Sequence, residues 1–121
     1  MKKIRIQVGK IELEGWLNET KTAAKVFENL PITSTVNTWG DEIYFTIPVD
    51  AGLENAKKLV ELGDIAYWPP GKAMCIFFGK TPVSVGDEIR PASPVNIIGR
   101  VEGDCKVLKK VKDGEEITIR R

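Results

Sequence analysis

Apolar and polar residues alternate strictly at the start of the chain. Residues 4–8 (IRIQV) and 11–14 (IELE) place apolar side chains at every second position, which is the period of a β-strand with one buried face. The link between these runs, Gly9-Lys10, has glycine first, as is typical of tight hairpin turns. The sequence therefore predicts an N-terminal β-hairpin.

Two later segments have apolar residues three and four positions apart, which is the period of an amphipathic helix. The first covers about residues 22–30, with Asn18 or Thr20 as the N-terminal cap and Pro31 at its end. The second is shorter and covers about residues 53–62. Each is apolar on one face only, so each is expected to cover part of a sheet rather than lie inside the core.

The rest of the chain is predicted to form short strands separated by turns. These strands are expected over residues 32–39, 43–47, 65–68, 73–78, 95–101, 105–111 and 117–120. Asp113-Gly114, between the last two, is a strong hairpin signal. About eight short strands with regular turn signals indicate a sandwich or a barrel. Because no linker divides the chain, we expect one domain over residues 1–121.

The pair Gly-Asp occurs at four places, each followed by a predicted strand or turn. They are Gly40-Asp41, Gly63-Asp64, Gly86-Asp87 and Gly103-Asp104. The aspartates could be oxygen ligands of a metal ion, or turn residues beside a glycine with positive φ. The turn interpretation is favoured because the segments between the pairs do not repeat. We therefore predict no metal site.

Composition and charge narrow the functional classes. The 121 residues are 42% hydrophobic and 29% charged with a net charge of +1, which gives no global field for nucleic acid or an anionic membrane. The N-terminus lacks the apolar core of a signal peptide, and no apolar run approaches the roughly 18 residues of a membrane span. We therefore expect a cytoplasmic protein without nucleic-acid or membrane partners.

Residue types limit the chemistry further. The sequence has no histidine, so no Ser-His-Asp or Cys-His arrangement can form. No phosphate-binding or dinucleotide-binding glycine motif is present, and no cofactor is predicted. Cys75 and Cys105 are expected to be buried thiols rather than a disulfide. Lysine and glutamate dominate the charged residues and Gln7 is the one glutamine, which is typical of thermophile proteins.

The most informative segment is 63–82, GDIAYWPPGKAMCIFFGKTP. Pro69-Pro70 must end a strand because proline lacks an amide hydrogen, and residues 73–78 indicate a strand buried on both faces. Successive strand residues face opposite sides, so Tyr67 and Trp68 cannot both point inward. The same holds for Tyr44-Phe45 and Phe77-Phe78. An outward aromatic side chain beside the prolines is expected to form a binding platform.

Four segments resemble the signature blocks of a known family: GDEIYF (40–45), GDIAYWPPG (63–71), CIFFGKTP (75–82) and SPVNIIG (93–99). The family consists of small prokaryotic proteins without an established function that adopt a cyclophilin-like barrel. The resemblance implies a mainly β fold, a closed antiparallel barrel of about eight strands with two short capping helices. True cyclophilins are prolyl isomerases with a Phe-Met-x-Gln-Gly-Gly segment and a pocket histidine, and this sequence has neither.

We predict a binding module whose pocket holds a small molecule or a proline-containing peptide. The residues expected to line it are Trp39, Tyr44, Tyr67, Trp68, Phe78, Thr81 and Pro82. The alternative is a divergent prolyl isomerase, because that reaction needs an apolar pocket and a cation or amide donor rather than an acid or base. Arg90 and Arg100 are the candidate catalytic cations. Edge strands and exposed aromatics would also allow a homodimer.

Overall fold

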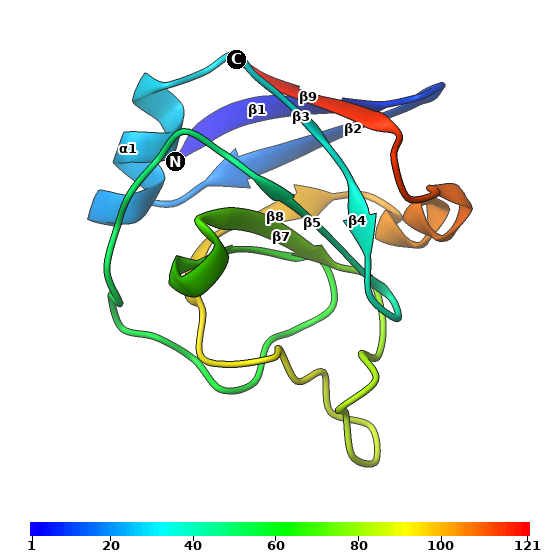
Figure 1. Ribbon diagram of the computed structural model, residues 1–121. Coiled ribbons are helices and arrows are strands. Elements are labelled where there is room, and N and C mark those ends of the chain that lie inside the picture. The colour runs from blue at the N-terminus through cyan, green and yellow to red at the C-terminus, as the bar shows by residue number, and fades with distance from the viewer.

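A nine-stranded antiparallel sheet forms most of the computed structural model, which describes residues 1–121 (Figure 1). The strands are β1 (Lys2–Val8), β2 (Ile11–Leu17), β3 (Ile32–Thr35), β4 (Asn37–Thr38), β5 (Glu42–Thr46), β6 (Asp64–Trp68), β7 (Ala73–Phe77), β8 (Asn96–Glu102) and β9 (Glu116–Arg120). Their order across the sheet is β3-β9-β1-β2-β8-β6-β7-β5-β4. The strands at the two edges, β3 and β4, are therefore neighbours in the chain.

These two edge strands close the sheet into an almost complete barrel. Only Val36 separates β3 from β4, so one bent segment pairs with β9 on one side and with β5 on the other. The Ser34 hydroxyl also donates a 2.7 Å hydrogen bond to the Thr46 carbonyl of β5. The predicted mainly β, closed antiparallel barrel is confirmed. The predicted strand 32–39 bends and divides at Val36, which adds one strand, and residues 105–111 form none, so the barrel has nine strands.

β1 and β2 form the predicted hairpin. Ile6 lies opposite Leu13, and Gly9 between the strands has a φ of +57°. The inward apolar residues of the hairpin join the main core, whose buried side chains fill the barrel. Full burial of one large aliphatic side chain contributes about 1.5–3 kcal/mol, so this interior is the chief source of stability.

The helix α1 (Lys21–Glu28) covers one end of the barrel (Figure 1). The Thr20 side chain accepts a 3.1 Å hydrogen bond from the Ala23 N–H, which confirms one of the two predicted N-terminal caps. Ala23 and Val26 face the main core and are fully buried. No helix of the structure combines the length and the apolar character needed to cross a bilayer.

The other end is covered by η2 (Cys105–Lys110), a 3-10 helix where a strand was predicted. Asp104 caps it by accepting a 3.0 Å hydrogen bond from a backbone N–H of its first turn. Cys105 and Leu108 are both buried, and this three-residue spacing suits a 3-10 turn. The predicted strand 105–111 is wrong for that reason. Asp113-Gly114 accordingly leads into β9 and does not join two strands.

The predicted capping helix over residues 53–62 is also wrong. This segment is an irregular connection that forms two isolated bridges to the chain before β8. Asn55 has a φ of +47°, which is incompatible with a continuous α-helix. The Glu54 carboxylate accepts hydrogen bonds from two backbone N–H groups at the start of α1, at 3.0 and 2.9 Å. These tertiary contacts outweigh the local helical pattern.

The four Gly-Asp pairs lie in turns, as predicted. Gly40, Gly63, Gly86 and Gly103 have φ values of +59°, +88°, +63° and +84°. Side chains are disfavoured in this region, whereas glycine adopts it freely. Each pair therefore marks a change of chain direction. Elsewhere, Cys75 and Cys105 are free thiols and both are buried.

Candidate functional site

β7 separates two apolar clusters, one on each of its faces. Met74 and Ile76 belong to the main core inside the barrel, whereas Cys75 and Phe77 belong to a second, smaller cluster outside it. All five residues of β7 are buried, which confirms the predicted strand with two buried faces. The long connections after β5 and β7 contribute the remaining cover of the outer cluster.

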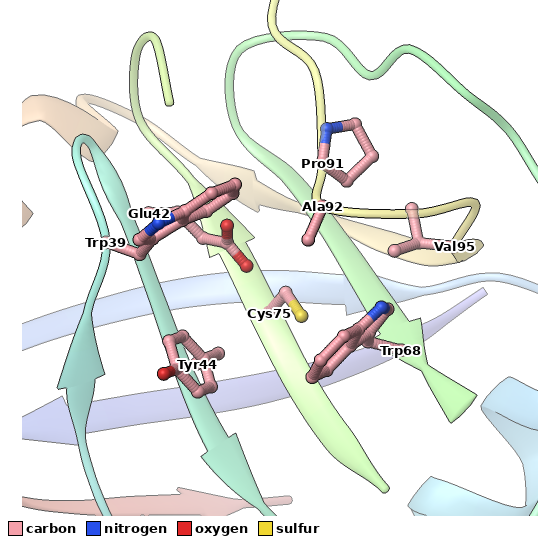
Figure 2. Close-up of a pocket in the computed structure, with 8 residues that line it drawn as sticks. All are labelled: Trp39, Glu42, Tyr44, Trp68, Cys75, Pro91, Ala92 and Val95. Carbon is pink, nitrogen blue, oxygen red and sulfur yellow. The ribbon is translucent and has the colours of Figure 1, made fainter. Parts of the chain in front are cut away.

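The outer cluster leaves a pocket of about 280 Å³ against β5, β6 and β7 (Figure 2). Its lining residues are Trp39, Glu42, Tyr44, Trp68, Cys75, Pro91, Ala92 and Val95. Six of these eight are hydrophobic, and one, Glu42, is charged. Ligand pockets usually measure roughly 300–1,000 Å³. This pocket lies at the lower limit of that range, so its size suits only a small molecule.

Strand register explains how the pocket is built. Tyr44 on β5 is directly opposite Cys75 on β7, so Cys75 forms the floor and Tyr44 one side. Glu42 lies two residues before Tyr44 and therefore projects from the same face of the sheet. Trp68, the last residue of β6, borders the other side (Figure 2). Trp39 reaches the pocket from the turn that precedes β5.

The turn between β4 and β5 fixes Trp39 beside Glu42. The Trp39 N–H donates to the Glu42 carbonyl at 2.9 Å, and the Glu42 N–H donates back to the Trp39 carbonyl at 3.2 Å. Gly40 between them has a positive φ, and a Cβ there would lie 2.8 Å from Cδ of Pro82. Backbone contacts therefore set this part of the rim.

Two contacts hold the Trp68 side chain in place. The indole Nε1 donates a 2.7 Å hydrogen bond to the Ser93 hydroxyl. The ring also packs over Gly71, where a Cβ would come within 2.7 Å of it. Gly71 is the last residue of η1 (Pro69–Gly71), a short 3-10 helix that follows β6. Its two prolines end the strand because proline has no amide hydrogen to donate. Trp68 therefore forms a fixed wall of the pocket.

Glu42 is the electrostatic centre of the pocket. Its residue surface is only 5% exposed, and Figure 2 shows its carboxylate directed toward the side of the pocket where Cys75 lies. None of the ion pairs of the protein includes it. Burial raises the pKa of Glu42 to about 7, and a hydrogen bond with the Cys75 thiol lowers it by less. Near neutral pH this side chain can therefore act as acid or as carboxylate.

Cys75 resists ionisation for the same physical reason as Glu42. Burial raises the pKa of the Cys75 thiol well above its ordinary value, and the neighbouring Glu42 carboxylate raises it further. The sulfur therefore contributes a polarizable apolar surface to the pocket floor. It is not placed to be a thiolate nucleophile.

A family profile described as cyclophilin-like matches residues 2–120. The chain belongs to the cyclophilin-like family. This finding confirms the resemblance seen in the four sequence blocks, which together cover only part of the matched region.

Two solved structures have the same fold. The solution structure of the hypothetical protein AF2241 from Archaeoglobus fulgidus is 51% identical, with a TM-score of 0.84 over 98% of this chain and 93% of that one. The structure of McbB in complex with tryptophan is 16% identical, with a TM-score of 0.72 over 98% of this chain but 44% of that one. Comparison with curated proteins found no match.

Three of the residues predicted to line the pocket do so: Trp39, Tyr44 and Trp68. Tyr67 and Phe78 lie in the main core instead, because each neighbours a residue that faces outward. The Tyr67 hydroxyl donates a 2.6 Å hydrogen bond to the Val49 carbonyl, which satisfies it inside the barrel. These two aromatic rings therefore stabilise the fold and do not line this pocket.

Thr81 and Pro82 lie outside the pocket, in the connection that follows β7. The Thr81 hydroxyl donates to the Arg90 carbonyl, and its N–H donates to the Ser84 hydroxyl at 3.0 Å. Pro82 is exposed and lies beside Gly40. Both residues shape the connection that carries Pro91 to the pocket rim.

Neither candidate catalytic arginine lines the pocket. Arg90 Nε donates to a Glu88 carboxylate oxygen at 2.6 Å. Arg100, opposite Asp64 in the pairing of β6 with β8, donates from Nη1 to Asp64 at 3.0 Å and to Glu61 at 3.2 Å. Both guanidinium groups are therefore engaged with carboxylates of their own.

The pocket residues that the sequence reasoning missed are Glu42, Cys75, Pro91, Ala92 and Val95. A signal for Glu42 was present, because it stands two residues before Tyr44 and shares its face of the strand. Cys75 was predicted to lie in a strand buried on both faces, and the pattern does not say which face of the sheet its side chain is on. Residues 91–95 line the pocket because their segment packs against β5, β6 and β7, and a local sequence pattern does not predict such a tertiary contact.

Proposed function

We propose that this protein binds a small molecule with a flat apolar group in the pocket between Trp39 and Trp68. The observation that carries the proposal is a preformed apolar pocket with three aromatic walls and one inward-facing polar group, Glu42. Small-molecule sites typically combine such apolar walls with very few convergent polar groups. Because the volume is about 280 Å³, the pocket suits one ring system with a short substituent.

A proline-containing peptide fits this pocket less well than a small molecule does. A pocket of this size would take a single peptide side chain, and the peptide backbone would have to bind elsewhere. Prolyl isomerisation would also need a cation or amide donor near the twisted bond, whereas the lining residues include a carboxylic acid and no basic side chain. We therefore favour binding over isomerisation.

The test uses the three tryptophans as reporters. Trp39 and Trp68 line the pocket, whereas Trp16 lies elsewhere and donates a 3.1 Å hydrogen bond to Glu102. Protein labelled with ¹⁵N gives separate indole N–H signals, which can be followed during titration with 2-phenylethanol and a panel of other one-ring aromatic compounds. We expect shifts at Trp39 and Trp68 but not at Trp16.

Variants provide the matched controls. Trp39→Ala removes one wall and should weaken binding of those compounds about tenfold or more, since an aromatic contact contributes about 1 kcal/mol beyond its buried area. Trp16→Ala, the control, should leave the affinity unchanged. The proposal is overturned if no compound moves the Trp39 and Trp68 signals, or if Trp16→Ala weakens binding as much as Trp39→Ala does. An X-Pro exchange assay that showed acceleration would restore the isomerase alternative.

A further inference from the structure

Glu42 is a buried carboxyl group without an ionic partner. It is 5% exposed, and burial is the largest influence on its ionisation. Buried charges in proteins are normally paired or coordinated, because an unpaired charge in an apolar site is costly. The Glu42 carboxylate nonetheless faces the pocket (Figure 2), and no lysine or arginine lines that pocket. The protein supplies the acid but not the partner.

We propose that the ligand supplies that partner: the pocket recognises an organic cation, an amine or quaternary ammonium group on a small apolar body. The inference rests on the proposed binding function and names its ligand class. The ammonium group would lie against Glu42, with the apolar body between the rings of Trp39, Tyr44 and Trp68. Each part of such a ligand then meets a group of matching chemistry.

The aromatic walls favour a cation independently of the carboxylate. A cation within about 6 Å of an aromatic ring is attracted by the ring quadrupole, and sites for quaternary ammonium ligands are commonly built from several such rings. Two tryptophans and a tyrosine border this pocket. An anionic ligand would meet the negative faces of the rings and, where Glu42 is ionised, its carboxylate as well, so it should bind more weakly than a cation.

Few other titratable groups face Glu42. From β7 the neighbour is the Cys75 thiol, and from β5 Tyr44 lines the pocket with its ring, its hydroxyl lying on the side away from Glu42 (Figure 2). β6 contributes Trp68, and the connection before β8 contributes only residues without titratable side chains. Asp41, next in the chain, is 3.8 Å from the ammonium group of Lys109. The protonation of Glu42 is therefore the main electrostatic variable in the pocket.

Binding of a cation should then depend on pH in a defined direction. The ligand pairs with the carboxylate and not with the neutral acid, so only the ionised fraction of Glu42 is competent to bind it. With the pKa of Glu42 at about 7, the apparent affinity should rise about tenfold between about pH 6 and about pH 8. A neutral ligand held by the rings alone should show little change.

Probes that share one ring but differ in charge provide the experiment. Benzyltrimethylammonium is a permanent cation, 2-phenylethanol is neutral and phenylacetate is an anion. Each is titrated into the ¹⁵N-labelled protein at about pH 6 and about pH 8, with the Trp39 and Trp68 indole signals as readout. At the higher pH we expect the cation to bind at least about tenfold more tightly than the alcohol, since a charge-assisted contact exceeds a neutral one.

Glu42→Gln tests the role of the carboxylate. The amide keeps the size of the side chain but cannot ionise, so the cation should lose its pH dependence and the part of its advantage that the carboxylate supplies, while the alcohol still binds. Glu116→Gln on the exposed face of β9 is the matched control and should change neither. If Glu42→Gln does not fold, the pH dependence of the wild-type protein toward the permanent cation gives the same answer.

The outcomes separate the two proposals. Equal binding of the cation and the alcohol, or an affinity for the cation that stays constant across this pH range, overturns the organic-cation inference and leaves the pocket as a general apolar site. Tighter binding of phenylacetate would overturn it as well. If none of the probes moves the Trp39 and Trp68 signals, the proposed binding function itself fails.

Discussion

The inner and outer faces of the sheet formed by β5, β7 and β6 have the same strands but different tasks. The inner face presents side chains such as Ile76 to a core of 25 buried residues, whereas the outer face presents Cys75 to a cluster of five. The large cluster fills the barrel, and the small one leaves an open pocket beside Glu42. Strand alternation thus divides one stretch of sequence into a face that fills the core and a face that carries the pocket of the proposed binding function.

Substitutions on the two faces of β7 should separate these tasks, with the largest effect inside. Ile76→Ala leaves a cavity in the main core and should lower the free energy of unfolding by about 2–5 kcal/mol. Cys75→Ala, one residue away on the outer face, should cost about 1 kcal/mol and enlarge the pocket. Denaturant unfolding followed by circular dichroism measures both. Equal losses would show that the outer cluster is as important to stability as the core.

The second prediction concerns the pH dependence of stability on the outer face. The pKa of Glu42 is about 7 in the folded protein, against an ordinary value of 4.5. Between these values the native state holds a proton that the unfolded chain has released, so Glu42 lowers stability progressively as the pH rises through this window. Above it the full difference amounts to about 3 kcal/mol.

Glu42→Gln should therefore stabilise the protein by up to about 3 kcal/mol at pH 8 and by little at pH 4. Thermal unfolding at several pH values measures the difference between variant and wild type. Glu116→Gln reports the effect of removing one negative charge from the surface. If the stability difference between Glu42→Gln and wild type did not grow with rising pH, the raised pKa would be contradicted. The pocket would then not keep an unpaired acid at the expense of stability.

A second buried acid shows what Glu42 lacks. Asp64, at the start of β6, is 6% exposed, and burial is the largest influence on its pKa, which it raises. It has partners, however: Arg100 at 3.0 Å and the Glu61 N–H at 2.8 Å. Asp64 thereby ties the connection before β6 to β8. Two carboxyl groups with comparable burial thus differ in their surroundings: Asp64 is paired within the fold, whereas Glu42 has no ionic partner and is free for the proposed ligand.

The sequence predicted the barrel well because its signals were local. The hairpin depends on alternation over residues 4–14, and β7 is apolar at every position, so its two buried faces follow directly. The helix over 53–62 failed because a local pattern competed with contacts made by Glu54 to α1. The predicted strand 105–111 failed because Cys105 and Leu108 are buried at the three-residue spacing of a 3-10 helix.

The pocket could be predicted only in part for a related reason. Alternation separates Trp68 from Tyr67 and Tyr44 from its neighbour Phe45, but it does not say which member of each pair faces the barrel interior. Because both Tyr67 and Trp68 were predicted to line the pocket, Tyr67 was placed on the wrong side of the sheet. Glu42 was overlooked because the predicted strand began at residue 43, whereas β5 begins at Glu42.

The smallest expected effect concerns how rigidly the outer face is held. Ser93→Ala removes the acceptor of the Trp68 indole N–H. Water can replace it because Trp68 is partly exposed, so stability should fall by less than about 1 kcal/mol. The ring would nevertheless lose its orientation, and the affinity for an aromatic probe should fall a few-fold because a less ordered wall must be fixed on binding.

Ser34→Ala is the matched control for this last comparison. Its hydroxyl donates one hydrogen bond to the Thr46 carbonyl near the seam between β3 and β5, away from the pocket lining. We expect a similar loss of stability there with no change in affinity for the probe, measured by thermal unfolding and by the indole titration. If Ser93→Ala also left the affinity unchanged, packing against Gly71 would be sufficient to position Trp68. The outer face would then owe its preformed shape to close backbone approach rather than to a polar anchor.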